Sequence, residues 1–101
     1  MDDITVNELK KRLDAGEKLV FIDVREPHEY AEFNLGAKLI PLGTLPDALE
    51  GLSKYKDTEI VVHCRSGARS GQAQIFMRQF GFTKVRNLIG GVLAWQREFG
   101  G

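Results

Sequence analysis

The residues best suited to chemistry lie in one short loop, which reads CRSGARS from Cys64 to Ser70. Cys64 is the only cysteine in the chain, and it follows the apolar run 60–62. The loop carries two guanidinium groups, on Arg65 and Arg69, among small residues whose backbone N–H groups can turn toward one centre. Converging N–H groups, positive charge and the start of a helix all favour a thiolate over a thiol. The loop therefore predicts an activated cysteine nucleophile that takes an anionic or sulfur-bearing electrophile.

The smaller loop residues have expected parts of their own. Gly67 suits a tight turn with positive φ, and Ala68 keeps the loop small. Ser66 and Ser70 can donate hydroxyl hydrogen bonds to an anion or cap the helix that follows. A lone cysteine after a buried strand is more often simple packing material, but the combination of strand, cysteine, Arg/Ser/Gly loop and helix favours a functional site.

Neither histidine is expected to act as a general base for Cys64. His63 directly precedes the cysteine, and neighbouring residues of a strand point to opposite faces of a sheet, so His63 is expected to be structural. His28 lies in the polar stretch EPHEY and is expected at the surface. A Cys–His dyad of the protease kind is not supported, and activation by the loop itself is the better account.

The elements that must position this loop alternate between strand and helix along the chain. Apolar and β-branched runs predict strands at 19–22, 38–40, 60–62 and 84–88. Caps and periodicity predict helices after the Thr5–Glu8 capping box and over 26–30, 45–50, 70–80 and 92–99. Such alternation implies one parallel sheet with helices on both faces. Asp23 and Cys64 both end strands, so we expect them to face one crevice beyond the carboxyl ends of the sheet.

Length and composition fit one domain with a small anion site. The 101 residues are 43% apolar and 28% charged, enough for one core, and residues 1–101 are expected to form a single domain. The net charge is zero, but residues 59–101 hold an excess of Lys and Arg around Cys64. Without a basic run or a long apolar run, neither a nucleic acid nor a membrane is an expected partner. One cysteine makes no internal disulfide and no multi-cysteine zinc site, so we expect no metal or cofactor, and a free thiol fits the cytoplasm.

Four stretches resemble, in order, the signatures of the rhodanese family of sulfurtransferases. They are FIDVREPHEY (21–30), GAKLIPL (36–42), IVVHCRSGARS (60–70) and GFTKVRNLIGGVLAW (81–95). Residues 36–49 are especially similar to rhodanese modules fused to enzymes that activate sulfur-carrier proteins. The family often has a Gly-His-Ile-x-Gly-Ala stretch where this chain has residues 32–37, EFNLGA, without the histidine. The resemblance implies an α/β fold with a five-stranded, mostly parallel sheet flanked by helices on both faces, forming a single rhodanese domain.

The resemblance also implies a reaction. The Cys64 thiolate would take the sulfane sulfur of a small anionic donor such as thiosulfate, and the resulting persulfide would pass it to cyanide, a thiol or a carrier protein. Backbone N–H groups of residues 65–69 would hold the outer sulfur, and Arg65 and Arg69 would orient the donor. Asp23 and Arg25 would support the loop from the first signature. A protein sulfur donor or acceptor is a further expected partner.

Two alternatives differ in class. A cysteine-dependent phosphatase or arsenate reductase on the same fold would carry a loop one residue longer, Cys-x5-Arg, whereas four residues separate Cys64 from Arg69 here. One residue spans at most about 3.3–3.6 Å, so the shorter loop favours a single added sulfur atom over a phosphoryl group. A non-catalytic regulatory module ranks third, because Cys64 and its loop are intact.

Overall fold

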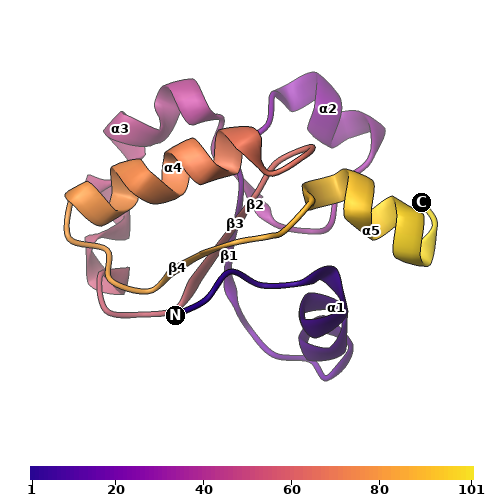
Figure 1. The fold of residues 1–101 in the computed structure, drawn as a ribbon. Helices are drawn as coiled ribbons and strands as arrows, with labels where there is room; N and C mark the ends of the chain where they lie inside the picture. The colour runs from indigo at the N-terminus through magenta and orange to yellow at the C-terminus, as the bar shows by residue number, and fades with distance from the viewer.

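Four parallel strands in the order β2-β1-β3-β4 form the centre of the computed structural model, which describes all 101 residues (Figure 1). They are β1 (Val20–Asp23), β2 (Lys38–Leu39), β3 (Ile60–His63) and β4 (Val85–Asn87). The expected α/β architecture is confirmed, but the sheet has four strands where five were expected. A single parallel bridge between Ile4 and Leu88 stands in the fifth place. Thr5 caps a helix immediately after Ile4, so the segment leaves the sheet after one residue.

The helices follow the predicted order with small shifts at their ends. They are α1 (Val6–Asp14), α2 (Pro27–Glu32), α3 (Leu45–Ala48), α4 (Ala68–Gln79) and α5 (Gly91–Phe99), with 3-10 turns at Leu42–Thr44 and Glu50–Tyr55. The Thr5 side chain accepts the Glu8 N–H at 3.1 Å, as a helix N-cap does. None of these helices has the length and apolar character needed to cross a membrane.

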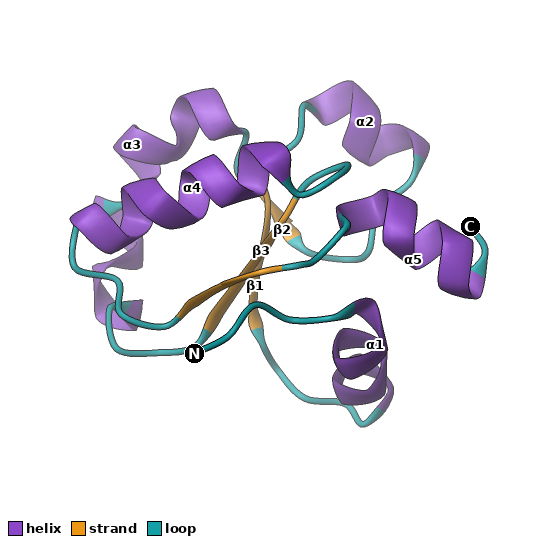
Figure 2. Ribbon diagram, in the orientation of Figure 1, coloured by secondary structure: helices purple, strands orange, loops and turns teal.

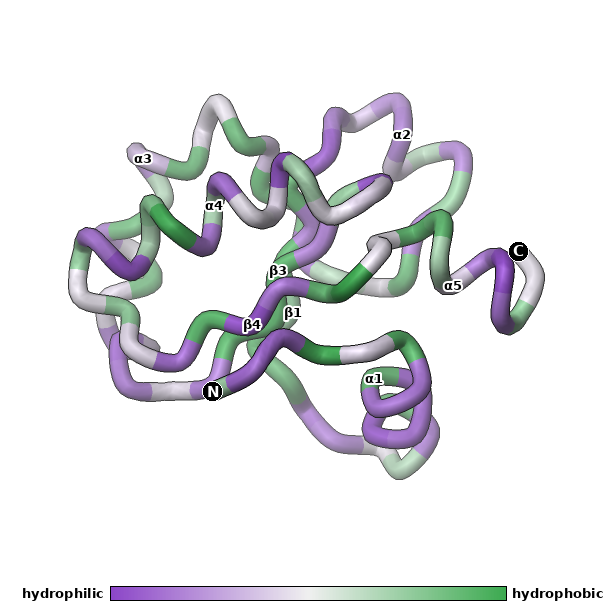
Figure 3. Tube along the Cα trace, in the orientation of Figure 1, coloured by the Kyte–Doolittle hydropathy of each residue, from purple (hydrophilic) through white to green (hydrophobic).

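Helices cover both faces of the sheet (Figure 2). α3, α4 and the 3-10 turn at 50–55 pack on one face around a core of 13 buried residues, whereas α1 and α5 pack on the other around seven. The buried side chains of β3 alternate between the two cores, with Ile60 and Val62 in the first and Val61 in the second. β1 and β3 are accordingly among the more hydrophobic parts of the trace (Figure 3). Each large apolar side chain buried in these cores contributes roughly 1.5–3 kcal/mol.

The strand register brings the polar strand ends together. Asp23 pairs with His63 across β1 and β3, and Val62 pairs with Asn87 across β3 and β4. Because all four strands run in the same direction, these residues and Cys64 gather at one edge of the sheet. This edge carries the candidate site.

Candidate active site

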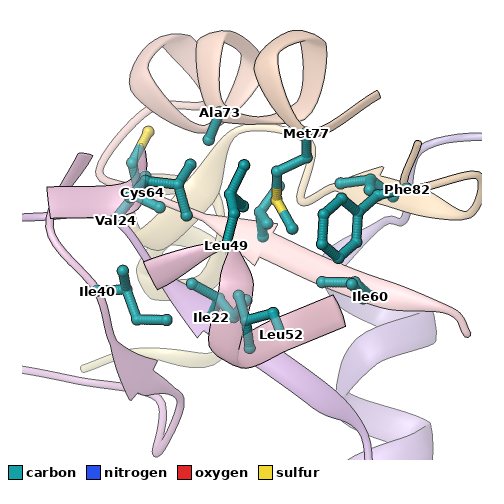
Figure 4. Packing of buried hydrophobic residues seen from close by; sticks show 13 residues of the cluster. Ile22, Val24, Ile40, Leu49, Leu52, Ile60, Cys64, Ala73, Met77 and Phe82 are labelled. Carbon is teal, nitrogen blue, oxygen red and sulfur yellow. The ribbon is translucent and has the colours of Figure 1, made fainter. Parts of the chain in front are cut away.

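Cys64 lies at the end of the larger core, directly after β3, and is 1% exposed. In Figure 4 its sulfur points toward α4. Gly67 adopts φ +105°, and this turn brings its N–H to 3.1 Å from the Cys64 sulfur. Gly67 is also the N-cap residue of α4, so the free N–H groups of the first helical turn face the same point. The predicted anion nest is therefore present around the sulfur.

The Cys64 thiol has competing influences on its pKa. Burial raises the pKa, because a charged sulfur is poorly solvated there. The Ser70 hydroxyl, 3.3 Å from the sulfur, and the backbone N–H groups of Ser70, Gly67 and Ser66 lower it. The hydrogen bonds prevail, and the pKa lies below its ordinary value. A thiolate is the nucleophilic form of cysteine, so the loop activates Cys64 without a histidine.

The first turn of α5 holds the loop from behind. The Val92 N–H donates to the Cys64 carbonyl and the Leu93 N–H to the Arg65 carbonyl, both at 3.0 Å. Gly91 lies so close to these two carbonyls that a Cβ atom there would be 2.5 Å from the Cys64 oxygen. The N–H groups at the start of α5 have no partner within their own helix, so the loop supplies one.

The two loop arginines differ in their surroundings. Arg69 forms a bidentate ion pair with Glu29 of α2, with distances of 2.6 and 2.8 Å. The Arg69 guanidinium lowers the pKa of the Glu29 carboxyl to about 2. Arg65 is exposed, forms no ion pair, and lines a cleft of about 160 Å³ between α2 and α5. Both arginines were expected to orient a donor, and Arg65 alone has a guanidinium that is free to do so.

Asp23 and Arg25 form a buried pair beside the loop. The Arg25 guanidinium donates to both Asp23 carboxylate oxygens at 2.8–3.0 Å and to the Phe33 carbonyl at 2.7 Å. These contacts tie the end of β1 to the segment after α2. Since α2 also carries Glu29, the pair fixes the element that engages Arg69.

His63 lies on the opposite face of β3 from the Cys64 side chain. Its ring stacks on Phe21 at 5.1 Å between centroids, and its Nε2 lies 3.5 Å from an Asp23 oxygen. Burial lowers the pKa of His63 to about 4, so the ring is neutral at physiological pH. This geometry agrees with the structural part expected for His63. His28 is exposed, as expected.

Two residues of this site were missed from the sequence. Glu29 binds Arg69, and Asn87 contacts both Ser70 and Gly67. Asn87 ends β4 next to β3, so the rule that placed Asp23 at the carboxyl edge could also have found it. The Glu29 contact joins residues 40 positions apart and gives no local signal. No group of three His, Cys, Asp or Glu side chains is arranged to hold a metal ion.

Comparison with known proteins gives a consistent result. The profile of the family described as "Rhodanese-like domain" matches residues 5–98. The "Probable adenylyltransferase/sulfurtransferase MoeZ" of Mycobacterium tuberculosis is 40% identical over 97 residues, which are 94% of this chain and 24% of that protein. A "Sulfurtransferase" of Allochromatium vinosum is 36% identical over 97% of this chain and 91% of its own. This chain thus spans about a quarter of the first relative and most of the second.

The fold is also found among solved structures. The crystal structure of a rhodanese-like domain protein from Staphylococcus aureus superposes with a TM-score of 0.79 and 33% identity, covering 94% of this chain and 91% of that one. The α/β fold implied by the four sequence signatures is therefore confirmed, with the difference in strand number described above.

Proposed function

The chain belongs to the rhodanese-like domain family, and on this basis we propose that it is a sulfurtransferase that carries sulfur as a Cys64 persulfide. The names of the relatives support the activity class, since one that matches over most of its length is called a sulfurtransferase. In this proposal residues 1–101 act as a single rhodanese domain. The observation that carries the proposal is the set of N–H and O–H donors around the Cys64 sulfur.

The proposed reaction has two steps. The Cys64 thiolate attacks the sulfane sulfur of an anionic donor such as thiosulfate, a new S–S bond forms, and sulfite leaves with the electron pair of the broken bond. The negative charge then lies on the outer persulfide sulfur, which the loop N–H groups of residues 65–69 would hold. A thiophilic acceptor, such as cyanide, a thiol or a carrier protein, attacks this outer sulfur and returns the electron pair to Cys64.

The ion pair of Arg69 argues against phosphoryl chemistry. A loop arginine that binds a transferring phosphoryl group must direct its N–H donors at the oxygens of that group. Here both terminal nitrogens of Arg69 bind the Glu29 carboxylate. With the short Cys-x4-Arg spacing, this favours sulfur over phosphate. The lowered pKa of Cys64 favours an active enzyme over a regulatory module that has no turnover.

Arg65 is the proposed contact for a small anionic donor, because its guanidinium is exposed and unpaired beside the loop. Similarity to MoeZ supports a second kind of partner, a protein that delivers or receives sulfur. A free catalytic thiol requires a reducing environment, and we therefore propose the cytoplasm as the place of action.

A mass measurement tests the proposal. Incubation with thiosulfate, or with a persulfide donor, should add about 32 Da, the mass of one sulfur atom in a Cys64 persulfide. Cyanide should remove this mass, and Cys64→Ser should never gain it. Absence of the adduct with every donor would overturn the proposal. Hydrolysis of p-nitrophenyl phosphate that depends on Cys64 would favour the phosphatase instead.

A further inference from the structure

Asn87, at the end of β4, touches the loop without touching the sulfur. Its Nδ2 donates to the Gly67 carbonyl at 3.1 Å, and its Oδ1 lies 2.6 Å from the Ser70 hydroxyl oxygen. The contact with Gly67 fixes the orientation of the amide, because a flipped amide would set two oxygens against each other. Asn87 therefore presents a fixed acceptor to Ser70.

Ser70 has one hydroxyl proton and two possible acceptors for it. One is Asn87 Oδ1 at 2.6 Å, and the other is the Cys64 sulfur at 3.3 Å. A hydroxyl donates only one hydrogen bond at a time, so the two acceptors compete. Ser70 is fully buried, so water does not replace the acceptor that loses the proton. When Cys64 is a neutral thiol, its own S–H can donate to the Ser70 oxygen while Ser70 donates to Asn87.

We infer that Asn87 is a positioning residue that sets the direction of the Ser70 hydroxyl and thereby limits how strongly the Cys64 thiolate is held. When Cys64 becomes a thiolate, the hydroxyl turns from Asn87 to the sulfur. Removal of the Asn87 acceptor frees this proton for the sulfur at all times. Asn87 thus weakens the thiolate relative to the neutral sulfur.

The same competition has a consequence for sulfur transfer, and this part rests on the proposed function. In a persulfide the inner Cys64 sulfur is uncharged, and the negative charge lies on the outer atom. The Ser70 proton then returns to Asn87. When an acceptor removes the outer sulfur, the electron pair of the S–S bond stays on the Cys64 sulfur, and the hydroxyl turns back. Asn87 therefore stabilises the loaded form relative to the unloaded thiolate.

The charged groups around Cys64 remain the same in the test variants. Arg69 on α4 acts on the sulfur while paired with Glu29 of α2, and Arg65 lies in the loop itself. Asp23 and Arg25 pair with each other at the end of β1, and His63 lies beyond β3. On β4, Arg86 binds Glu8 and Glu59 rather than the loop. A change at Asn87 alters none of these charges.

The rate of Cys64 alkylation by iodoacetamide, measured across pH, reads the thiolate directly and needs no sulfur transfer. Asn87→Ala should move the pH profile to lower pH and raise the alkylation rate at mildly acidic pH by about tenfold, the effect of one hydrogen bond to a charged group. Ser70→Ala should move the profile to higher pH. In the double variant Asn87→Ala should have no further effect, because its action passes through Ser70.

A purely structural part for Asn87 predicts a different result. If Asn87 only braces the Gly67 carbonyl, Asn87→Ala will move the profile equally with and without Ser70, and this result would overturn the inference. A shift of the single variant to higher pH would also overturn it. Asn87→Leu, which keeps the volume of asparagine, replaces Asn87→Ala if thermal unfolding shows that the smaller side chain disrupts the fold. A correct coupling together with no persulfide in the mass measurement would reject the proposed function and leave the part of Asn87 intact.

Discussion

Gly91→Ala should damage the loop around Cys64 although residue 91 belongs to a different element. Gly91 has φ +57°, and an added Cβ would lie 2.5 Å from the Cys64 oxygen and 2.6 Å from the Arg65 oxygen. Both contacts are with backbone atoms, which cannot rotate aside as a side chain does. The loop or the start of α5 must therefore move.

The structure gives the size of the effect. An alanine in the left-handed region costs roughly 1–2 kcal/mol, and overpacking of a tight contact costs roughly 1–3 kcal/mol. The displacement also weakens two hydrogen bonds, from the Val92 and Leu93 N–H groups, each worth about 1 kcal/mol. The free energy of unfolding should therefore fall by about 3–7 kcal/mol.

Gly16→Ala provides the matched control. Gly16 has φ +78°, but no atom lies within 4 Å of its added Cβ, so only the backbone strain of roughly 1–2 kcal/mol remains. Urea unfolding gives the free energy of each variant, and alkylation gives the reactivity of Cys64. Gly91→Ala should lose stability and thiol reactivity together, whereas Gly16→Ala should keep normal reactivity. Equal losses of stability in the two variants, with Cys64 unaffected in both, would refute this reasoning.

Two further predictions concern charged residues. Arg65→Ala should lower the rate with thiosulfate by about tenfold and the rate with a persulfide donor less, because an unpaired cation attracts a dianion most; an equal loss with both donors would contradict a donor-orienting part. Glu59→Gln should reduce the stability at neutral pH by about 2 kcal/mol, since Glu59 binds Arg12 and Arg86 at 2.6–2.8 Å. The Arg12 hydrogen bond lowers the Glu59 pKa from 4.5 to about 2, so wild-type Glu59 adds stability above pH 4.5 and loses it as the pH falls to 2. The difference between the two proteins, measured by urea unfolding, should shrink over that interval, and a constant difference would contradict the assigned ion pairs.

Local patterns were sufficient to predict most of the fold. β-Branched runs, caps and glycines act over a few residues, and they predicted the four strands and five α-helices to within a few residues at each end. The opposite directions of His63 and Cys64 follow from strand geometry alone. The fifth strand was wrong because the number of residues that pair with β4 depends on where α1 begins. That start leaves only Ile4 for pairing.

The pairing of distant side chains was beyond the sequence. Arg65 and Arg69 look equivalent in the loop, yet only Arg69 meets a carboxylate, since α2 brings Glu29 to its side. Glu8 looked like the second half of a capping box, but its carboxylate binds Arg86, 78 positions away. An arginine or glutamate side chain reaches several partners, and the tertiary fold decides among them. The nucleophile was predictable because its activation depends on local backbone, whereas the division of work between the arginines was not.

The direction of the loop donors has its cause in α5. In a planar trans peptide the C=O of one residue and the N–H of the next point in opposite directions. The Cys64 and Arg65 carbonyls both turn toward the first turn of α5, where the Val92 and Leu93 N–H groups bind them. The N–H groups of Arg65 and Ser66 must therefore turn away from α5, and the Ser66 N–H is one of the groups that lower the pKa of Cys64. The thiolate site thus depends on two helix starts with different tasks: α4 directs its own N–H groups at the sulfur, and α5 orients the peptide planes of the loop so that their N–H groups are available to it.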